Sequence, residues 1–219
     1  MLIINFKTYE NGTGKKGYVI AKKIDSFAKK SKTKVAIAVQ AADIYRISKD
    51  VKTLIFAQHA DPINPGKSNG YISLESLKEA GAKGVLINHS EHLMNTGDIE
   101  FVINKCKKLN LISVVCASDP WIAEALVKFR PDYIAVEPPE LIGGNMSVSR
   151  ADPQIITMAV SKVSGKKNSN KVLIGAGIQD SKDVSRALAL GAEGVLVSFS
   201  VMNSKTPEKV VKELLNGFK

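Results

Sequence analysis

The segment AGAKGVLI at residues 80–87 recurs as LGAEGVLV at residues 190–197. In each copy one glycine closes a helical pattern, and a second glycine precedes an apolar, strand-like run. The second copy follows the first after about half of the 219 residues. A junction of helix and strand that recurs at half the chain length indicates a fold built from repeated strand and helix units.

Along the rest of the chain, on both sides of this repeat, short apolar runs alternate with amphipathic stretches. The runs with strand character are Leu2–Phe6, Val35–Val39, Leu54–Ala57, Val85–Ile87, Ile112–Cys116, Tyr133–Val136, Val172–Ile174 and Val195–Val197. Helical patterns between and after them include Tyr18–Lys30, Leu74–Ala80, Ile99–Leu109, Pro120–Phe129, Pro153–Val163, Lys182–Leu190 and Glu208–Leu215. Strands that are apolar at consecutive positions suit a parallel sheet buried on both faces.

Eight strand-then-helix units predict an α/β fold, a closed parallel (β/α)₈ barrel, as a single domain over residues 1–219. An open doubly wound sheet is the alternative fold. It is disfavoured because no G-x-G-x-x-G follows the first strand. The sequence also shows no low-complexity linker that would mark a domain boundary.

Composition predicts a soluble cytoplasmic protein. Hydrophobic residues make up 44% of the chain, enough for a sizeable core. The two cysteines, Cys106 and Cys116, do not form a disulfide framework, which favours a reducing compartment. No apolar run approaches the roughly 20 residues that span a bilayer, so we expect no membrane partner.

The net charge of +10 raises the question of nucleic-acid binding. Basic pairs such as Lys22-Lys23 and Lys107-Lys108 are spread over helical patterns, with few arginines and no interleaved aromatic residues. This distribution is typical of solvated helix faces. It also suits an anionic small substrate, so nucleic acid is not the expected partner.

Polar residues follow the predicted strands where a parallel barrel carries its chemistry, at the carboxyl ends. These positions hold Asn5-Phe6-Lys7, Gln58-His59, Asn88-His89-Ser90-Glu91, Glu137, Gly175-Ala176-Gly177 and Ser198. Ser90 and Glu91 are also compatible with a short helix start. We therefore expect these side chains to share one rim of the barrel.

Glu137 lies in the segment DYIAVEPPELIGGNMSVS, residues 132–149. Pro138-Pro139 cannot donate to a sheet ladder, so Glu137 is predicted as the last residue of its strand. The following Gly143-Gly144 and small polar residues have the composition of a loop that can cover a site. A surface glutamate in an ordinary loop is the alternative for this segment alone.

The glycines after the seventh strand and the residues after the eighth predict a phosphate cradle. Gly175 and Gly177 allow close approach of the backbone to a ligand, and the loops after strands seven and eight commonly hold phosphate in this fold. A simple tight turn is the alternative for the Gly-Ala-Gly motif.

Together these motifs resemble the triosephosphate isomerase family in its short archaeal-type form, and they run in the family's order from first strand to last. The motifs are Asn5-Phe6-Lys7-Thr8-Tyr9, Asn88-His89-Ser90-Glu91, Val136-Glu137-Pro138-Pro139-Glu140-Leu141-Ile142-Gly143 and Gly175-Ala176-Gly177-Ile178. The resemblance implies a TIM barrel that interconverts dihydroxyacetone phosphate and D-glyceraldehyde 3-phosphate through an enediolate, in glycolysis and gluconeogenesis.

The resemblance also implies roles for single residues. Glu137 becomes the general base, His89 the electrophile, and Lys7 a fixed positive charge that binds substrate beside Asn5. Phosphate would be held by the backbone at Ile142, Gly143, Gly177, Ser198 and Phe199. No cofactor or metal is implied. Three places depart from the family pattern. Phe199 stands among usually small residues, His92 stands where arginine is common, and Gly144-Asn145-Met146 replaces a commoner Thr-Gly pattern in the loop.

The segment HADPINPGKSNGY, residues 59–71, is long for a connection from strand to helix. In the family this segment looks like an arm that inserts into a neighbouring subunit near Lys7. The resemblance therefore implies self-association, as a homodimer or homotetramer.

Other functions stay open at this point. Another phosphate-binding barrel acting on a larger sugar phosphate is the enzyme alternative, and a basic nucleic-acid-binding barrel is the non-enzyme one. His89, Glu91 and His92 match neither H-E-x-x-H nor H-x-x-E-H, which argues against a metal site. Cys116 is expected to be a packing residue rather than a nucleophile. Glu137 and Glu140 are separated by Pro138-Pro139, which argues against a glycosidase pair.

Overall fold

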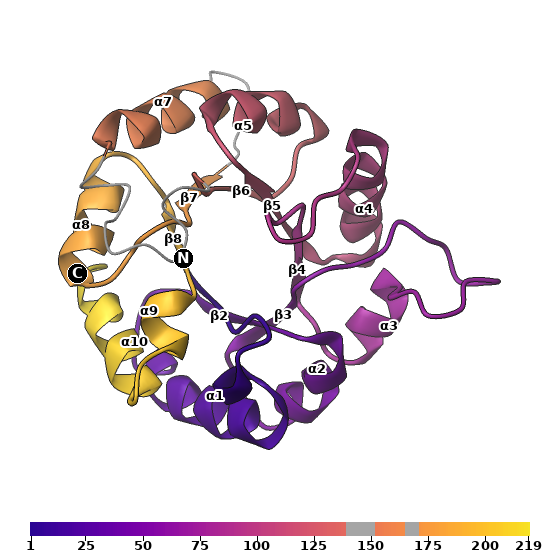
Figure 1. The fold of residues 1–219 in the computed structure, drawn as a ribbon, viewed down its shortest axis with the longest axis horizontal. Coiled ribbons are helices and arrows are strands. Elements are labelled where there is room, and N and C mark those ends of the chain that lie inside the picture. Colours follow the sequence, from indigo (N-terminus) through magenta and orange to yellow (C-terminus); the bar gives the residue numbers. More distant parts are fainter. Residues whose placement is uncertain (139–151, 165–170) are drawn as a thin grey trace.

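The structure is a computed structural model that describes residues 1–138, 152–164 and 171–219. Eight parallel strands close into a barrel in chain order, and helices surround it (Figure 1). The strands are β1 (Leu2–Asn5), β2 (Val35–Val39), β3 (Leu54–Ala57), β4 (Gly84–Ile87), β5 (Ile112–Ala117), β6 (Tyr133–Val136), β7 (Lys171–Ile174) and β8 (Gly194–Val197). The predicted (β/α)₈ barrel is confirmed, and no predicted strand boundary differs by more than one residue.

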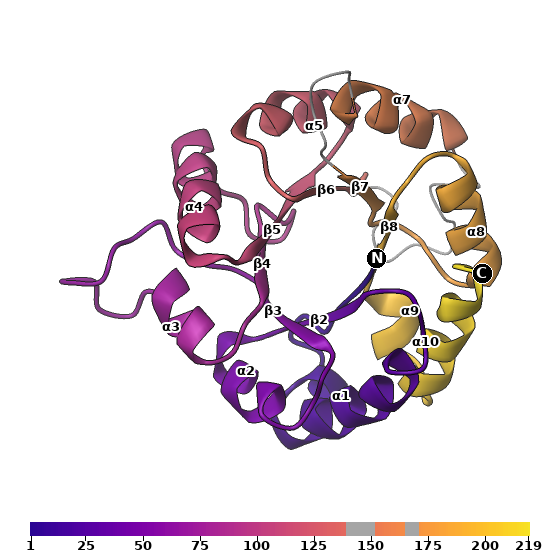
Figure 2. The ribbon, with the colours of Figure 1, turned by 180° about the vertical axis from the view of Figure 1, so that it is seen from behind.

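The first and last strands close the barrel. Leu2 of β1 is in register with Val35 of β2 on one side and with Val195 of β8 on the other. Figure 2 shows the same closed ring from behind. Because every strand pair is parallel, all eight carboxyl ends meet at one rim, which brings residues distant in sequence together.

The alternation of side chains along the strands produces two apolar layers. Ile3, Phe56 and Leu86 belong to the cluster inside the barrel, where Cys116 also packs as predicted. Leu2 and Ile4 belong to the cluster between strands and helices. All of these side chains are buried, so consecutive apolar residues in a strand reflect two buried faces rather than one.

The helices are α1 (Gly14–Ala28), α2 (Ala41–Ser48), α3 (Leu74–Glu79), α4 (Thr96–Leu109), α5 (Pro120–Leu126), α7 (Pro153–Val163), α8 (Ser181–Ala189), α9 (Phe199–Met202) and α10 (Pro207–Asn216), with 3₁₀ turns η1 (Glu10–Gly12) and η2 (Val127–Phe129). The sequence patterns did not include α2, α9 or η1. Two of these are single turns, too short to show helical periodicity. Within the described residues, no helix is long and apolar enough to cross a membrane.

The repeated segment has the same conformation in both copies. Gly81 and Gly191 have φ angles of 102° and 98°, in the left-handed region where glycine ends helices without strain. Gly84 and Gly194 begin β4 and β8, and a Cβ at Gly84 would lie 2.7 Å from the carbonyl oxygen of Ile112. The repeat therefore reflects one structural unit used twice around the barrel.

Candidate active site

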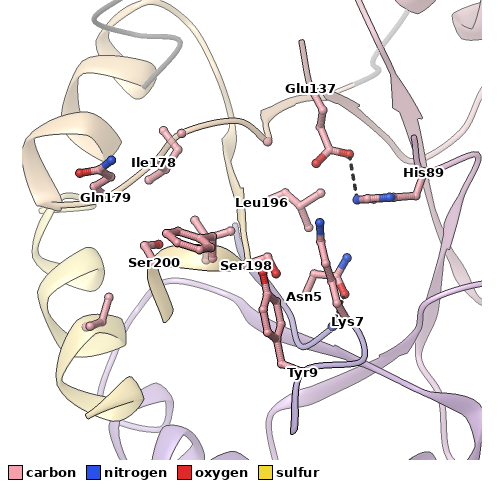
Figure 3. A pocket seen from close by; sticks show the side chains of 15 residues that line it. Asn5, Lys7, Tyr9, His89, Glu137, Ile178, Gln179, Leu196, Ser198 and Ser200 are labelled. Carbon is pink, nitrogen blue, oxygen red and sulfur yellow. Dashed lines mark hydrogen bonds and ion pairs between the residues drawn. The ribbon is translucent and has the colours of Figure 1, made fainter. Parts of the chain in front are cut away.

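One cavity of about 320 Å³ opens at the carboxyl rim of the barrel. Its lining includes every predicted site residue that the structure describes, namely Asn5, Lys7, His89, Glu137, Gly177, Ser198 and Phe199. Figure 3 shows Glu137, His89 and Lys7 converging on this space from different strands. Ile142, Gly143 and Glu140 lie outside the described residues.

Glu137 follows β6 directly, so this strand ends at Val136, one residue before the predicted last residue Glu137. Its N–H donates to the carbonyl of Ala117 at 2.9 Å, which extends the pairing with β5 by one bond. The residue is 4% exposed, and its Oε2 has no hydrogen-bond partner in the described part of the chain. Burial raises the pKa of Glu137 to about 7, although the Cys116 thiol and the charge of Lys7 oppose that rise. Glu137 is thus a base suited to neutral pH.

This raised pKa predicts that stability falls as pH rises. The folded chain holds the Glu137 proton more tightly than a carboxyl of ordinary pKa 4.5. The resulting contribution is full below pH 4.5 and is lost as pH rises through about 7. At pH 8 we therefore expect Glu137→Gln to unfold with a free energy about 2–4 kcal/mol above that of the parent chain. Urea unfolding at pH 5 and pH 8, at fixed protein concentration, measures the difference. An equal gap at both pH values would contradict the expectation.

Gly175 gives the Glu137 side chain its space. The residue follows β7, and its N–H donates to the carbonyl of Val136 at 2.9 Å. A Cβ here would overlap Cγ of Glu137 and come within 2.8 Å of its Oε1. The sequence motif suggested a phosphate cradle for this glycine, whereas the structure shows its contact with the carboxylate.

We expect Gly175→Ala to lower kcat by about 10²-fold, because a displacement of about 1 Å in a reacting group can cost that much. Thermal unfolding should change far less than activity. Ala176→Gly is the matched control, since it removes a methyl group from the neighbouring buried position. Steady-state kinetics on both variants tests the assignment, and a fully active Gly175→Ala enzyme would refute it.

His89 faces Glu137 with its Nε2, which lies 3.8 Å from Oε2 of the carboxylate. On the other side of the ring, the N–H of Glu91 donates to Nδ1 at 3.1 Å. Because Nδ1 accepts this bond, the neutral ring carries its proton on Nε2, toward the cavity. Burial and the neighbouring charge of Lys7 lower the pKa of His89, which favours this neutral form. The ring is therefore set up as a hydrogen-bond donor.

The short helix start suggested at Ser90-Glu91 is wrong. These residues form a turn, and α4 begins only at Thr96. In this turn the N–H of His92 donates to the carbonyl of His89 at 2.7 Å. The donor that fixes the His89 ring is thus a turn amide rather than the end of a regular helix.

Lys7 is held in an uncommon backbone conformation. Its φ of 45° lies in the left-handed region, which costs a non-glycine residue free energy. The Asn5 side chain accepts from the N–H of Lys7 at 3.0 Å, and Gln58 Nε2 donates to the Lys7 carbonyl at 2.9 Å. These two bonds fix the backbone so that the ammonium reaches the cavity. No role for Gln58 was predicted from the sequence, although its position directly after β3, at the carboxyl rim, was a usable signal.

The Lys7 ammonium forms an ion pair with Glu91, with Nζ 2.6 Å from Oε1. The Lys7 side chain is 15% exposed, whereas that of Glu91 is 60% exposed and lies at the rim. Glu91 therefore bonds to both Lys7 and His89, and it couples two of the converging groups.

The predicted phosphate contacts Gly177, Ser198 and Phe199 line the same cavity as His89. Gly177 has a φ of 69°, which glycine adopts without strain. Ser198 precedes α9, and its carbonyl accepts the first helical bond from Val201 N–H at 3.0 Å. The N–H groups of Phe199 and Ser200 therefore precede the hydrogen-bond ladder of this turn. The Phe199 side chain is 40% exposed.

Among residues 1–138, 152–164 and 171–219, no group of three or more His, Cys, Asp or Glu side chains is arranged to hold a metal ion. The ring of His92 stacks on the ring of His59. The converging groups are instead one carboxylate, one imidazole and one ammonium.

A closed (β/α)₈ barrel with such a polar cavity at the carboxyl ends of its strands defines a barrel enzyme. Comparison with known families narrows this class, because the family described as triosephosphate isomerase matches residues 1–214. The chain belongs to the triosephosphate isomerase family, whose members are isomerases.

Individual relatives agree with this assignment. A triosephosphate isomerase from Methanocaldococcus jannaschii is 44% identical over 215 residues, covering 98% of each chain. One from Saccharolobus solfataricus is 42% identical over 217 residues, covering 99% of this chain and 95% of the relative. The crystal structure of triosephosphate isomerase from Bartonella henselae has the same fold, with a TM-score of 0.77 at 18% identity over 98% of this chain and 95% of that one.

Proposed function

We propose that this chain interconverts dihydroxyacetone phosphate and D-glyceraldehyde 3-phosphate through an enediolate, with Glu137, His89 and Lys7 as catalytic residues. One observation carries the proposal. A buried carboxylate with a pKa of about 7 and the Nε2 of a neutral imidazole lie 3.8 Å apart over a cavity that Lys7 also lines. Family membership supplies the substrate class.

The reaction needs a base that moves one proton between adjacent carbons. Glu137 removes a proton from the carbon beside the carbonyl and returns it to the neighbouring carbon. The electron pair left behind moves onto oxygen, so the enediolate carries negative charge on its oxygens. His89 donates from Nε2 to these oxygens, and the Lys7 ammonium supplies a fixed positive charge. The carbon-bound proton moves from C1 to C2 through Glu137, and the hydroxyl proton moves from O1 to O2, the two oxygens to which His89 donates. Atoms and electrons therefore balance, and the reaction is redox-neutral.

Phosphate binding is assigned to backbone groups of the loops after β7 and β8. We propose Gly177, Ser198 and Phe199 as these contacts, supported by their place in the cavity lining. Ile142 and Gly143 are added from the resemblance alone. Asn5 binds substrate beside Lys7 and also positions the Lys7 backbone through the bond to its side chain.

The direct test is isomerase activity. The purified chain and Glu137→Gln, prepared in parallel, are assayed with dihydroxyacetone phosphate by coupling aldehyde formation to a dehydrogenase. We expect kcat/KM in the ordinary enzymatic range of about 10⁴–10⁸ M⁻¹s⁻¹ for the parent chain. Activity only on larger sugar phosphates would replace the proposal with another phosphate-binding barrel. The cavity of about 320 Å³ favours the small substrate.

Self-association forms a further part of the proposal. The segment between β3 and α3 extends away from the barrel wall (Figures 1 and 2). Its base is closed by two bonds between Asp61 and Ile72, and Lys105 holds it through the carbonyl of Ile63. Tyr71, near its end, is 58% exposed. We propose that this arm docks on a second copy, giving a homodimer or homotetramer.

We expect light scattering to report at least a dimer, and removal of residues 64–70 to give a smaller species with reduced kcat. Val19→Ala, a substitution at an exposed apolar position on α1, serves as the control. Full activity of a monomer at nanomolar concentration would contradict the proposed arm.

We further propose one catalytic domain over residues 1–219, acting in the cytoplasm without a nucleic-acid or membrane partner. The match of the family to residues 1–214 supports the single domain. A salt titration of nucleic-acid binding tests the expected absence of that partner, because a protein that neutralises phosphates shows a steep salt dependence.

A further inference from the structure

Two of the three histidines of the chain stack on each other beside the third. His59 lies in the loop after β3, and His92 lies in the turn after β4. Their ring centroids are 3.8 Å apart, and their planes differ by 14°. Neither ring lines the cavity that holds His89 and Glu137. The stack therefore joins two loops from outside the site.

On one side, the stack is tied to the catalytic turn. The N–H of His92 donates to the carbonyl of His89 at 2.7 Å. Between them in sequence, Glu91 donates its N–H to His89 Nδ1 and accepts from Lys7 Nζ. A movement of His92 is thus transmitted to the bond that fixes the His89 ring and to the ion pair that holds Lys7.

On the other side, the stack is tied to the base of the arm. His59 Nε2 lies 3.2 Å from Oδ1 of Asp61, whose Oδ2 accepts from the N–H of Ile72. The residue before His59 is Gln58, which bonds to the carbonyl of Lys7. The loop after β3 therefore supports the catalytic residues twice, through Gln58 and through the ring of His59.

The charged groups around the pair make it sensitive to protonation. Asp61 lies on the loop of His59, Glu91 on the turn of His92, and Lys7 pairs with Glu91 from the loop after β1. Burial lowers the pKa of His59, Asp61 opposes this, and the neighbouring His92 lowers it further. Two protonated rings in a stack repel each other, so a second proton enters the pair only at the cost of the contact.

We propose that His92 is a positioning residue, which through its stack on His59 holds the turn with His89 and Glu91 in working position while the pair carries at most one proton. The expected effect on catalysis rests on the proposed function. The coupling between the two rings is independent of that function. The sign follows from the lowered pKa of His59. The contact is intact at and above the ordinary pKa of 6.5 and is lost as pH falls through the lowered pKa of His59.

The first test measures the titration of the stacked histidines in the absence of substrate. Because the chain has three histidines, the ring nitrogens of each can be followed by ¹H–¹⁵N NMR during a pH titration. We expect His59 to titrate below 6.5, and the His59 pKa to rise in His92→Phe, which keeps a flat ring and removes the charge. An unchanged His59 pKa in that variant would overturn the inference. This result is independent of whether the chain isomerises triose phosphates.

The second test measures the effect of the His59–His92 stack on kcat and on its pH dependence. We expect His92→Ala to lower kcat about tenfold with little change in KM, and His92→Phe to recover most of that loss. In both variants the fall of kcat below pH 6.5 should become shallower, since the second proton of the pair no longer contributes. Leu93→Ala, at the next position of the turn and 73% exposed, is the matched control.

A His92→Ala enzyme with the parent kcat and the parent pH profile would overturn the positioning role. So would a loss in Leu93→Ala equal to that in His92→Ala, because the effect would then belong to the turn as a whole. If the parent chain shows no isomerase activity, the proposed function fails, and the NMR titration still decides whether the two rings are coupled.

Discussion

Replacement of Glu137 by glutamine is expected to lower kcat by about 10³-fold, within the range that general acid–base catalysis contributes. The amide keeps the shape of the buried side chain but cannot accept the substrate proton. KM should change little, because the substrate contacts assigned to Lys7 and to the loops after β7 and β8 remain. Such a pattern, a loss in kcat without a loss in binding, identifies a group that acts in the transition state.

Glu100→Gln provides the control, because Glu100 is an exposed carboxylate on α4. Circular dichroism and thermal unfolding show whether Glu137→Gln remains folded. We expect the variant to be at least as stable as the parent chain at pH 8, as the raised pKa of Glu137 implies. Turnover within tenfold of the parent enzyme would exclude Glu137 as the base.

Replacement of Lys7 by methionine is expected to lower kcat/KM by about 10²- to 10³-fold, the scale for removing one group that stabilises developing charge. Methionine keeps much of the side-chain length and removes the ammonium. The same change should raise the pKa of both Glu137 and His89, because the charge of Lys7 lowers each of them. The acid limb of the pH profile of kcat/KM, set by Glu137 near pH 7, should therefore move upward.

Steady-state kinetics across pH 5 to 9 measures both effects. Lys15→Met on α1 is the matched control, because this lysine is exposed and does not line the cavity. A Lys7→Met enzyme whose acid limb stays at the parent pH would show that Lys7 exerts no field on Glu137. Lys7 would then have to be treated as a structural residue.

The barrel could be predicted from sequence because its strands are buried on both faces. Runs such as Val35–Val39 are apolar throughout, so they contrast with the polar loops at both ends. The converging site followed from topology, since parallel strands place their carboxyl ends at one rim. For this reason Lys7, His89 and Glu137 could be grouped before their distances were known.

Contacts between distant loops could not be predicted in this way. The left-handed backbone of Lys7 depends on Gln58, fifty-one positions along the chain. Both residues follow predicted strands, but no local pattern shows that they bond to each other. The need for glycine at Gly175 comes from the Glu137 side chain on a neighbouring strand. The His59 and His92 stack likewise depends on how two loops meet at the rim.

The burial of Glu137 connects stability with function. Its Oε2 lacks a partner within the described residues, and burial of the carboxyl group is the main cause of the raised pKa. A well-paired carboxylate would cost the fold less but would be a weaker base at neutral pH. Glu137 is therefore expected to lower stability at neutral pH and to provide activity through the same burial.

The central claim, proton transfer by Glu137 through an enediolate, is tested most directly by converting dihydroxyacetone phosphate in D₂O and following the product by NMR. The account predicts that the parent enzyme forms D-glyceraldehyde 3-phosphate with deuterium at C2 in a measurable share of turnovers, because the proton held by Glu137 can exchange with solvent. Glu137→Gln should form no product above the buffer rate on the same timescale. Product formed at the parent rate by Glu137→Gln, with or without deuterium at C2, would contradict it.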